Sequence, residues 1–151
     1  MAIKPVNKDS LTLLQEKYNK FWTKFNAISA CDKEFVKNFK VHTIASVRGY
    51  QDYSVGKAYQ ICIKVNFDKE QVVIQAYFNN LVIYDDIYSH HRDRIEMMIG
   101  KRLEWKEMTT KAYALLNLNI PFQVSDMDNW DDVCNEIIPS AILMKNVFER
   151  F

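Results

Sequence analysis

The segment YQICIKVNFDKEQVVIQAYF, residues 59–78, contains two runs in which apolar and polar residues alternate. The apolar residues are Tyr59, Ile61, Ile63, Val65 and Phe67 in the first run, and Val72, Ile74, Ala76 and Phe78 in the second. A period of two places such a set on one face of a β-strand. The polar residues Asp68-Lys69-Glu70 separate the runs, so the segment predicts a β-hairpin with one buried face.

A second hairpin is predicted further along the chain. Leu103 and Trp105 alternate with charged residues, and after Thr109-Thr110 the apolar residues return at Ala112, Ala114, Leu116 and Leu118. Between the two hairpins, apolar residues from Tyr84 to Ile99 recur with a helical period, which predicts a middle helix. Gly100 follows at the position where a left-handed residue commonly ends a helix.

The region before the first hairpin predicts two helices. From Ser10, a plausible N-cap, a helical stripe is formed by Leu14, Tyr18, Phe21, Phe25 and Ile28. A second, short helix is predicted after Asp32, and Val41–Val47 is a candidate short strand.

A C-terminal helix is predicted from the inward spacing of Val133, Ile137, Ala141, Met144 and Phe148. Pro139 is expected to kink this helix or split it in two. The predicted fold is α+β, with a mostly antiparallel sheet of four to five strands built from the two hairpins. A long N-terminal helix, the middle helix and the C-terminal helix pack on this sheet, and residues 1–151 form a single domain.

The composition is that of an ordinary globular chain, with 48% hydrophobic and 26% charged residues. No apolar run approaches the roughly 20 residues of a membrane span, so we expect no membrane association. The three cysteines, Cys31, Cys62 and Cys134, are widely separated and form no CxxC pair. They predict buried thiols in a cytoplasmic protein.

Basic residues are concentrated at the start of the chain. The overall net charge is +1, but residues 1–48 contain nine Lys or Arg and four Asp or Glu. Lys17, Lys20 and Lys24 lie on the flank of the long helix that is opposite its apolar stripe. They either solvate the outside of a surface helix or form part of an anion-binding surface.

The segment RGYQDYSVGKAY, residues 48–59, combines basic and aromatic residues. Arg48 and Lys57 suit neutralisation of a phosphate backbone, and Tyr50 and Tyr53 suit stacking on bases. The alternative interpretation is that these tyrosines pack at the edge of the core and expose only their hydroxyl groups.

Catalytic signatures are weak. A helix, three strands, a helix and a strand is the element order of a restriction-endonuclease-like core, but the strand at residues 71–77 contains no Glu-x-Lys to bind Mg²⁺. Glu96, Asp85 and Asp86 are the acids left as candidates. His90 and His91 are adjacent, so their side chains diverge on a helix, and we predict no metal site and no cofactor.

Several short motifs resemble a bacterial and archaeal domain of unknown function of about this length. They are Phe21-Trp22, Tyr53-Ser54-Val55-Gly56, Arg94-Ile95-Glu96, Ile99-Gly100, Leu103-Glu104-Trp105, Lys111-Ala112, Asp128 and Trp130. The resemblance covers nearly the whole chain. It implies no catalytic residues, but the domain is often found C-terminal to nuclease-like domains, which implies a role related to DNA or to defence.

The preferred functional hypothesis is a non-catalytic binding module that associates with nucleic acid or with a nuclease-type protein of a defence or restriction system. Its contact residues would be Arg48, Tyr50, Tyr53, Lys57, Lys17, Lys20, Lys24 and Arg94. The first alternative is a degenerate or divergent restriction-endonuclease-like enzyme that uses Glu96, Asp85 or Asp86. The second alternative is a protein-interaction module or homodimer, with the aromatic residues at its interface.

Overall fold

The computed structural model describes residues 11–55, 59–108 and 112–151, and contains six helices and five strands within these ranges. The elements in chain order are α1 (Leu13–Ala30), α2 (Lys33–Asn38), β1 (Tyr50–Ser54), β2 (Tyr59–Asn66), β3 (Gln71–Phe78), α3 (Leu81–His90), α4 (Arg92–Ile99), β4 (Glu104–Met108), β5 (Tyr113–Pro121), η2 (Met127–Asn129, a 3₁₀ turn) and α5 (Trp130–Phe148). None of the helices described is both long and apolar enough to cross a membrane.

The five strands form one antiparallel sheet in the order β1-β2-β3-β5-β4. Both predicted hairpins are present, as β2-β3 and β4-β5. They are joined by pairing between β3 and β5, in which Ile74 lies opposite Leu118. The predicted α+β fold with a mostly antiparallel sheet is therefore confirmed.

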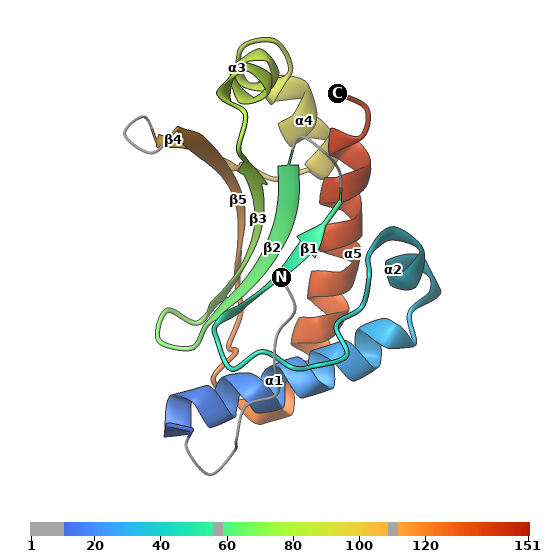
Figure 1. Ribbon diagram of the computed structural model, residues 1–151, viewed down its shortest axis with the longest axis vertical. Helices are drawn as coiled ribbons and strands as arrows, with labels where there is room; N and C mark the ends of the chain where they lie inside the picture. The colour runs from blue at the N-terminus through green and yellow to red at the C-terminus, as the bar shows by residue number, and fades with distance from the viewer. Residues whose placement is uncertain (1–10, 56–58, 109–111) are drawn as a thin grey trace.

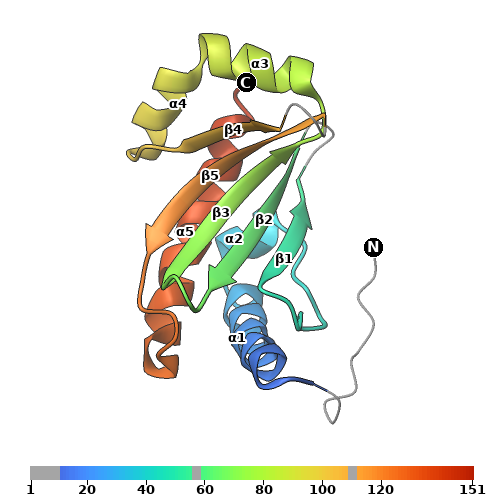
Figure 2. The same cartoon turned by 90° about the vertical axis from the view of Figure 1, so that its left-hand side faces the viewer.

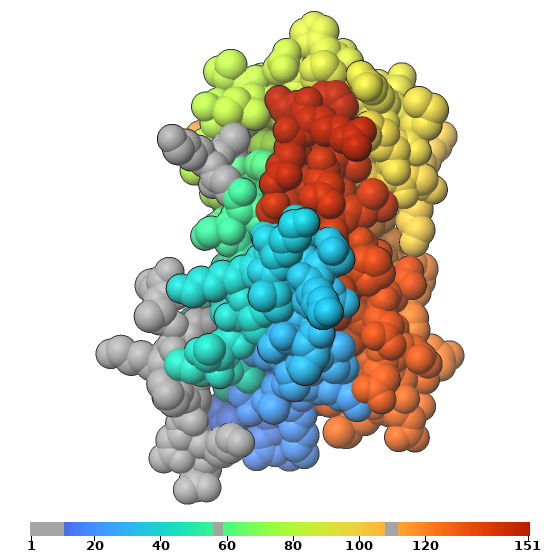
Figure 3. All heavy atoms as spheres, turned by 90° about the vertical axis from the view of Figure 1, so that its right-hand side faces the viewer, coloured from blue at the N-terminus to red at the C-terminus, as the bar shows by residue number. Residues whose placement is uncertain are grey.

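The helices α1, α2 and α5 lie on one face of this sheet, and α3 and α4 lie across one of its ends (Figure 1). Figure 2 shows the opposite face of the sheet toward the viewer, with α5 and α2 behind it. In the space-filling view, α5 runs along the molecule with α2 beside it and α1 across its lower part (Figure 3). The core lies between these helices and the sheet, and it includes the alternating apolar residues of both hairpins.

The helix α1 begins with a capping box. The side chain of Thr12 accepts a hydrogen bond from the backbone N–H of Gln15, and the side chain of Gln15 accepts one from the backbone N–H of Thr12. Ser10, the predicted N-cap, lies outside the described residues. Phe21 and Phe25 of the predicted stripe are fully buried, as is Trp22, whose indole N–H donates to the Arg48 carbonyl at 2.7 Å.

The predicted middle helix is in fact two helices. His91 separates α3 from α4, with φ −129° and ψ −4°. The His91 N–H still donates to the Ile87 carbonyl, and the His91 carbonyl accepts from the Ile95 N–H, so both helix ends keep a backbone partner while the chain changes direction. The prediction of one helix from Tyr84 to Ile99 is therefore wrong at its midpoint.

Three local predictions are also corrected. Residues 41–47, all within the described part of the chain, form no strand, and the side chain of Asn19 donates to the carbonyl of Ala45. Pro139 lies inside α5, which continues as one helix through it, so the predicted split into two helices is wrong. Cys31 is exposed, whereas Cys62 and Cys134 are buried.

Gly100 ends α4 in the left-handed region, with φ +79°, as predicted. A Cβ at this position would meet no atom within 4 Å, so a substitution would strain only the backbone.

We expect Gly100→Ala to lower the free energy of unfolding by about 1 kcal/mol, because L-residues disfavour this conformation. Urea denaturation measures the change. Gly100→Asn is the matched variant. We expect it to lower the free energy of unfolding by less than Gly100→Ala does, because asparagine tolerates the left-handed region. Equal stability of Gly100→Ala and the parent chain would contradict the assigned backbone conformation.

Candidate functional site

Two of the three predicted lysines of α1 are engaged near the start of α5. The ammonium group of Lys17 donates to the Ser125 carbonyl at 2.8 Å and lies 4.5 Å from the ring centroid of Phe67. The ammonium group of Lys24 is 3.0 Å from the Asp131 carboxylate. Lys20 is exposed. Trp22, which lies on another side of α1, contacts the Arg48 backbone. Among the predicted contact residues, Lys17 and Lys24 therefore lie on one side of α1, whereas Arg48 lies near another side of this helix.

Arg48 and Tyr50 lie together at the edge of the sheet. The Arg48 guanidinium donates to the Tyr50 hydroxyl at 2.9 Å. Because strand side chains alternate, β1 directs Tyr50 and Asp52 to the face opposite that of Gln51 and Tyr53.

The prediction that Tyr53 contacts a ligand is wrong. Its side chain is only 2% exposed and packs against both Phe35 and Phe39. Burial raises the pKa of its phenol, and its oxygen accepts a hydrogen bond from the Gln51 amide at 3.0 Å. Lys57, the remaining candidate of this segment, lies outside the described residues.

The sheet face opposite the core is covered by no helix within residues 11–55, 59–108 and 112–151 (Figure 2). We call this surface the open face. The register of the strands assigns to it Tyr50, Asp52, Ser54, Gln60, Cys62, Lys64, Asn66, Gln71, Val73, Gln75, Tyr77, Glu104, Lys106, Tyr113, Leu115, Asn117 and Asn119. It is mostly polar and aromatic, in contrast to the apolar face that packs on the helices.

A row of hydrogen bonds crosses the middle of the open face. The Gln75 amide donates to the Asn117 side-chain oxygen at 2.8 Å, and the Asn117 amide donates to the Glu104 carboxylate at 3.2 Å. The Lys106 ammonium lies 3.0 Å from the same carboxylate. Hydrogen bonds from Lys106 and Asn117 lower the pKa of Glu104. These bonds hold the central amides in fixed orientations.

A shallow hollow of about 180 Å³ lies beside this row. It is lined by Tyr50, Asp52, Gln60, Cys62, Lys64, Gln75 and Tyr77. Burial raises the pKa of the Cys62 thiol, and the neighbouring Asp52 carboxylate raises it further. The thiol therefore stays protonated at neutral pH and is a poor nucleophile, so the hollow offers contact surface and hydrogen-bonding groups.

The tyrosines of the open face leave part of their rings accessible. Tyr77 and Tyr113 are partly buried, and their ring centroids lie 5.1 Å apart. Tyr50 is also partly buried and lies on the edge strand β1. Tyr77, Tyr113 and Lys64 were missed as candidate residues, although each shares the strand alternation of its polar neighbours.

The three candidate acids are not brought together. The Glu96 carboxylate on α4 accepts a hydrogen bond from the Leu103 backbone N–H at 2.7 Å and so ties α4 to the start of β4. The Asp86 carboxylate on α3 lies 3.1 Å from His90 Nδ1, and Asp85 is exposed. Among the described residues, no group of three or more His, Cys, Asp or Glu side chains has the arrangement of a metal site.

Arg94 lies on α4, away from Arg48 and Tyr50. It is exposed, and its guanidinium is 5.7 Å from the ring centroid of Phe151. It therefore belongs to a different surface from the open face.

These features define an α+β domain in which helices cover one face of a five-stranded antiparallel sheet and the other face presents polar and aromatic side chains. The chain belongs to the DUF4268 family, a domain of unknown function, whose model matches residues 17–151. The predicted resemblance to a domain of unknown function is confirmed. The chain has no match among curated proteins or solved structures.

Proposed function

We propose that this domain is a non-catalytic binding module and that its open face binds single-stranded nucleic acid. The observation that carries the proposal is the combination of part-exposed Tyr50, Tyr77 and Tyr113 with lysine and amide side chains on a sheet face that no described helix covers. We also propose that the module associates with a nuclease-type protein, as the family resemblance implies.

Stacking supplies the first part of the binding energy. An unpaired base has two accessible ring faces, and stacking on an aromatic side chain contributes about 1–3 kcal/mol per base. In a duplex the bases are already stacked on one another, so tyrosines on a broad sheet face favour a single strand.

Charge and hydrogen bonding supply the rest. Lys64 lies on the open face, and Arg48 lies at its edge, where these side chains can neutralise phosphates. The face also carries Asp52 and Glu104, but the Glu104 carboxylate is paired with Lys106. Side-chain amides such as those of Gln60 and Asn119 donate and accept hydrogen bonds, which suits the edges of unpaired bases.

We expect Tyr77→Ala to weaken the binding of a mixed-sequence DNA oligonucleotide by about 5- to 150-fold, which corresponds to the loss of one stacked base. Fluorescence anisotropy at low ionic strength measures the affinity. Tyr77→Phe keeps the ring and should retain binding. Tyr88→Ala, which removes a part-exposed tyrosine from α3, is the control away from the open face.

Phosphate contacts make the binding constant depend on salt concentration. If Arg48 and Lys64 each neutralise one phosphate, the plot of log K against log salt concentration should have a slope of about −1.4. Absence of salt-sensitive binding to single strands would refute the proposal. Equal affinity for a duplex would refute its single-strand specificity.

A homodimer formed through the open face is the competing proposal. Leu115 adds partly exposed apolar surface to this face, and a second copy would bury it. Size-exclusion chromatography with light scattering separates the two proposals, because a dimer that Tyr77→Ala dissociates would assign the face to self-association. The nuclease-like alternative gains no supporting observation, since among the described residues Glu96, Asp85 and Asp86 belong to no group with the arrangement of a metal site.

A further inference from the structure

An apolar pocket of about 440 Å³ lies at the α3 end of the molecule, on the helix side of the sheet. Its walls are built from the start of β2, the end of β3, α3 and the end of the chain after α5. Four aromatic rings contribute to it, those of Tyr59, Phe78, Phe148 and Phe151. Its volume falls within the range of about 300–1,000 Å³ that is typical of sites for small organic molecules.

Asp86 is the acidic residue that lines this pocket. Its carboxylate lies 3.1 Å from His90 Nδ1 and 3.9 Å from His91 Nε2. The Arg94 guanidinium is near the pocket residue Phe151, at 5.7 Å from its ring centroid. A carboxylate only accepts hydrogen bonds, so a ligand group that meets Asp86 must donate them.

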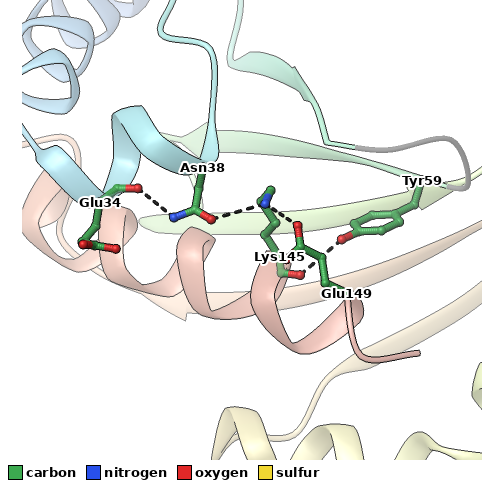
Figure 4. Close-up of polar contacts among 5 residues, drawn as sticks. All are labelled: Glu34, Asn38, Tyr59, Lys145 and Glu149. Atoms are coloured by element: carbon green, nitrogen blue, oxygen red, sulfur yellow. Dashed lines mark hydrogen bonds and ion pairs between the residues drawn. The ribbon is translucent and has the colours of Figure 1, made fainter.

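A ligand group that meets the Tyr59 hydroxyl can also donate a hydrogen bond to it. The Tyr59 hydroxyl donates to the Lys145 carbonyl at 3.3 Å, which leaves the oxygen able to accept (Figure 4). Burial and the nearby Glu149 raise the pKa of Tyr59, so the hydroxyl keeps its proton at neutral pH. Both polar groups of the pocket therefore accept hydrogen bonds from a ligand.

The backbone of Lys145 contacts Tyr59, but its ammonium group is directed elsewhere. Figure 4 shows its ammonium between the Asn38 side chain and the Glu149 carboxylate. The side chain of Asn38 in turn donates to the Glu34 carbonyl at 2.8 Å, so the cluster joins α2 to α5. Lys145 does not line the pocket.

We propose that this pocket binds a small organic amine with an apolar body, with its ammonium at the Asp86 carboxylate and its body among the aromatic rings. Aromatic ring faces attract cations, and this attraction grows when the site is partly desolvated. The aliphatic walls Val82, Ile83 and Ile87 suit the uncharged part of such a molecule. An anion of the same shape would meet the Asp86 carboxylate and be repelled.

Three probes of similar shape test the charge requirement. We expect phenethylamine to bind at least about tenfold more tightly than phenethyl alcohol, and hydrocinnamate to bind more weakly than either. Protein-observed NMR titration gives the affinities and shows whether the shifted resonances lie at Ile83, Ile87 and Phe148. Equal affinities for the three probes, no binding of the amine, or shifts elsewhere would overturn the proposal.

Asp86→Asn tests the residue. It keeps the shape of the side chain and removes the charge, so phenethylamine should bind about tenfold more weakly while the alcohol is unaffected. Asp85→Asn is a matched control, because Asp85 precedes Asp86 on the same helix, is exposed as Asp86 is, and does not line the pocket. Unchanged amine binding in Asp86→Asn would overturn the assignment, and thermal unfolding of both variants verifies that each is folded.

The pocket and the open face lie on different sides of the sheet and share no residue. Asp86→Asn should therefore leave oligonucleotide binding unchanged, and Tyr77→Ala should leave amine binding unchanged. Failure of one proposal is thus distinguishable from failure of the other.

Discussion

Replacement of Phe21 by alanine is expected to lower the free energy of unfolding by about 3–5 kcal/mol. Phe21 is fully buried, and its ring packs edge-to-face against Trp22 at 5.0 Å, Trp130 at 5.3 Å and Phe67 at 6.4 Å between ring centroids. These partners belong to α1, α5 and the residue that follows β2. Because three separate elements surround the ring, they cannot close together over the space that its removal leaves.

Chemical denaturation of Phe21→Ala measures this loss, provided that the denaturant dependence is unchanged. Leu13→Ala is the control in the same helix, since Leu13 is 87% exposed and its replacement should change stability by no more than about 0.5 kcal/mol. If Phe21→Ala cost less than about 1 kcal/mol, α1 would not pack on α5 and the sheet as described.

The hairpins and the end of α4 were predictable because their signals are local. Alternation over residues 59–78 sets the buried face of two neighbouring strands, and Gly100 occupies a conformation that few other residues tolerate. The break at His91 was not predictable, because apolar spacing continues through it to Ile95 and Ile99. The pairing of β3 with β5 depends on tertiary packing, which hydrophobic periodicity does not encode.

The candidate surface was only partly predictable. The mixture of basic and aromatic residues at 48–59 led to Arg48 and Tyr50, which do lie together. It also led to Tyr53, because no strand was predicted between residues 48 and 58, whereas β1 alternates there and turns that side chain into the core. Tyr77 was overlooked because alternation divides a strand into two faces without showing which face the helices leave uncovered.

The two proposed sites differ in how firmly the fold holds them. The open face stands on the central strands of the sheet, and its amides are fixed by the bonds from Gln75 to Asn117 and from Asn117 to Glu104. The pocket is closed partly by Phe151, at the end of the chain after α5, and by Val82, which is 78% exposed. We therefore infer that ligand binding moves the walls of the pocket more than it moves the side chains of the open face.

Raising the pH from 9 to 12 is expected to unfold the protein, and this is the largest effect that we predict. Five acidic groups are buried or partly buried in their neutral form, and burial raises the pKa of each above its ordinary value: Tyr53, Tyr59, Tyr84, Cys62 and Cys134. The pKa rises to about 12 for both Tyr84 and Cys134. In the unfolded chain the ordinary values are 10.0 for tyrosine and 9.0 for cysteine.

The sign of the effect follows from proton binding. A group with a raised pKa in the folded state stabilises the fold fully below its unfolded pKa, and this contribution is lost as the pH rises toward the folded pKa. Each group contributes at most about 1.4 kcal/mol per pH unit, and less where solvent screens it, as at the part-exposed Tyr59. Five such groups acting together can remove up to about 14 kcal/mol within about two pH units, which is comparable to the roughly 5–15 kcal/mol of a typical domain.

Circular dichroism and tyrosinate absorbance, followed together between pH 9 and 12, check this prediction. We expect one cooperative transition in which loss of helix coincides with ionisation of the buried tyrosines, because these phenols ionise only when the chain opens. Tyr84→Phe removes one of the ionising groups and should shift the midpoint to higher pH. Ionisation of all tyrosines while the helical signal persists would show that Tyr53 and Tyr84 are accessible to solvent, which contradicts their burial in the core.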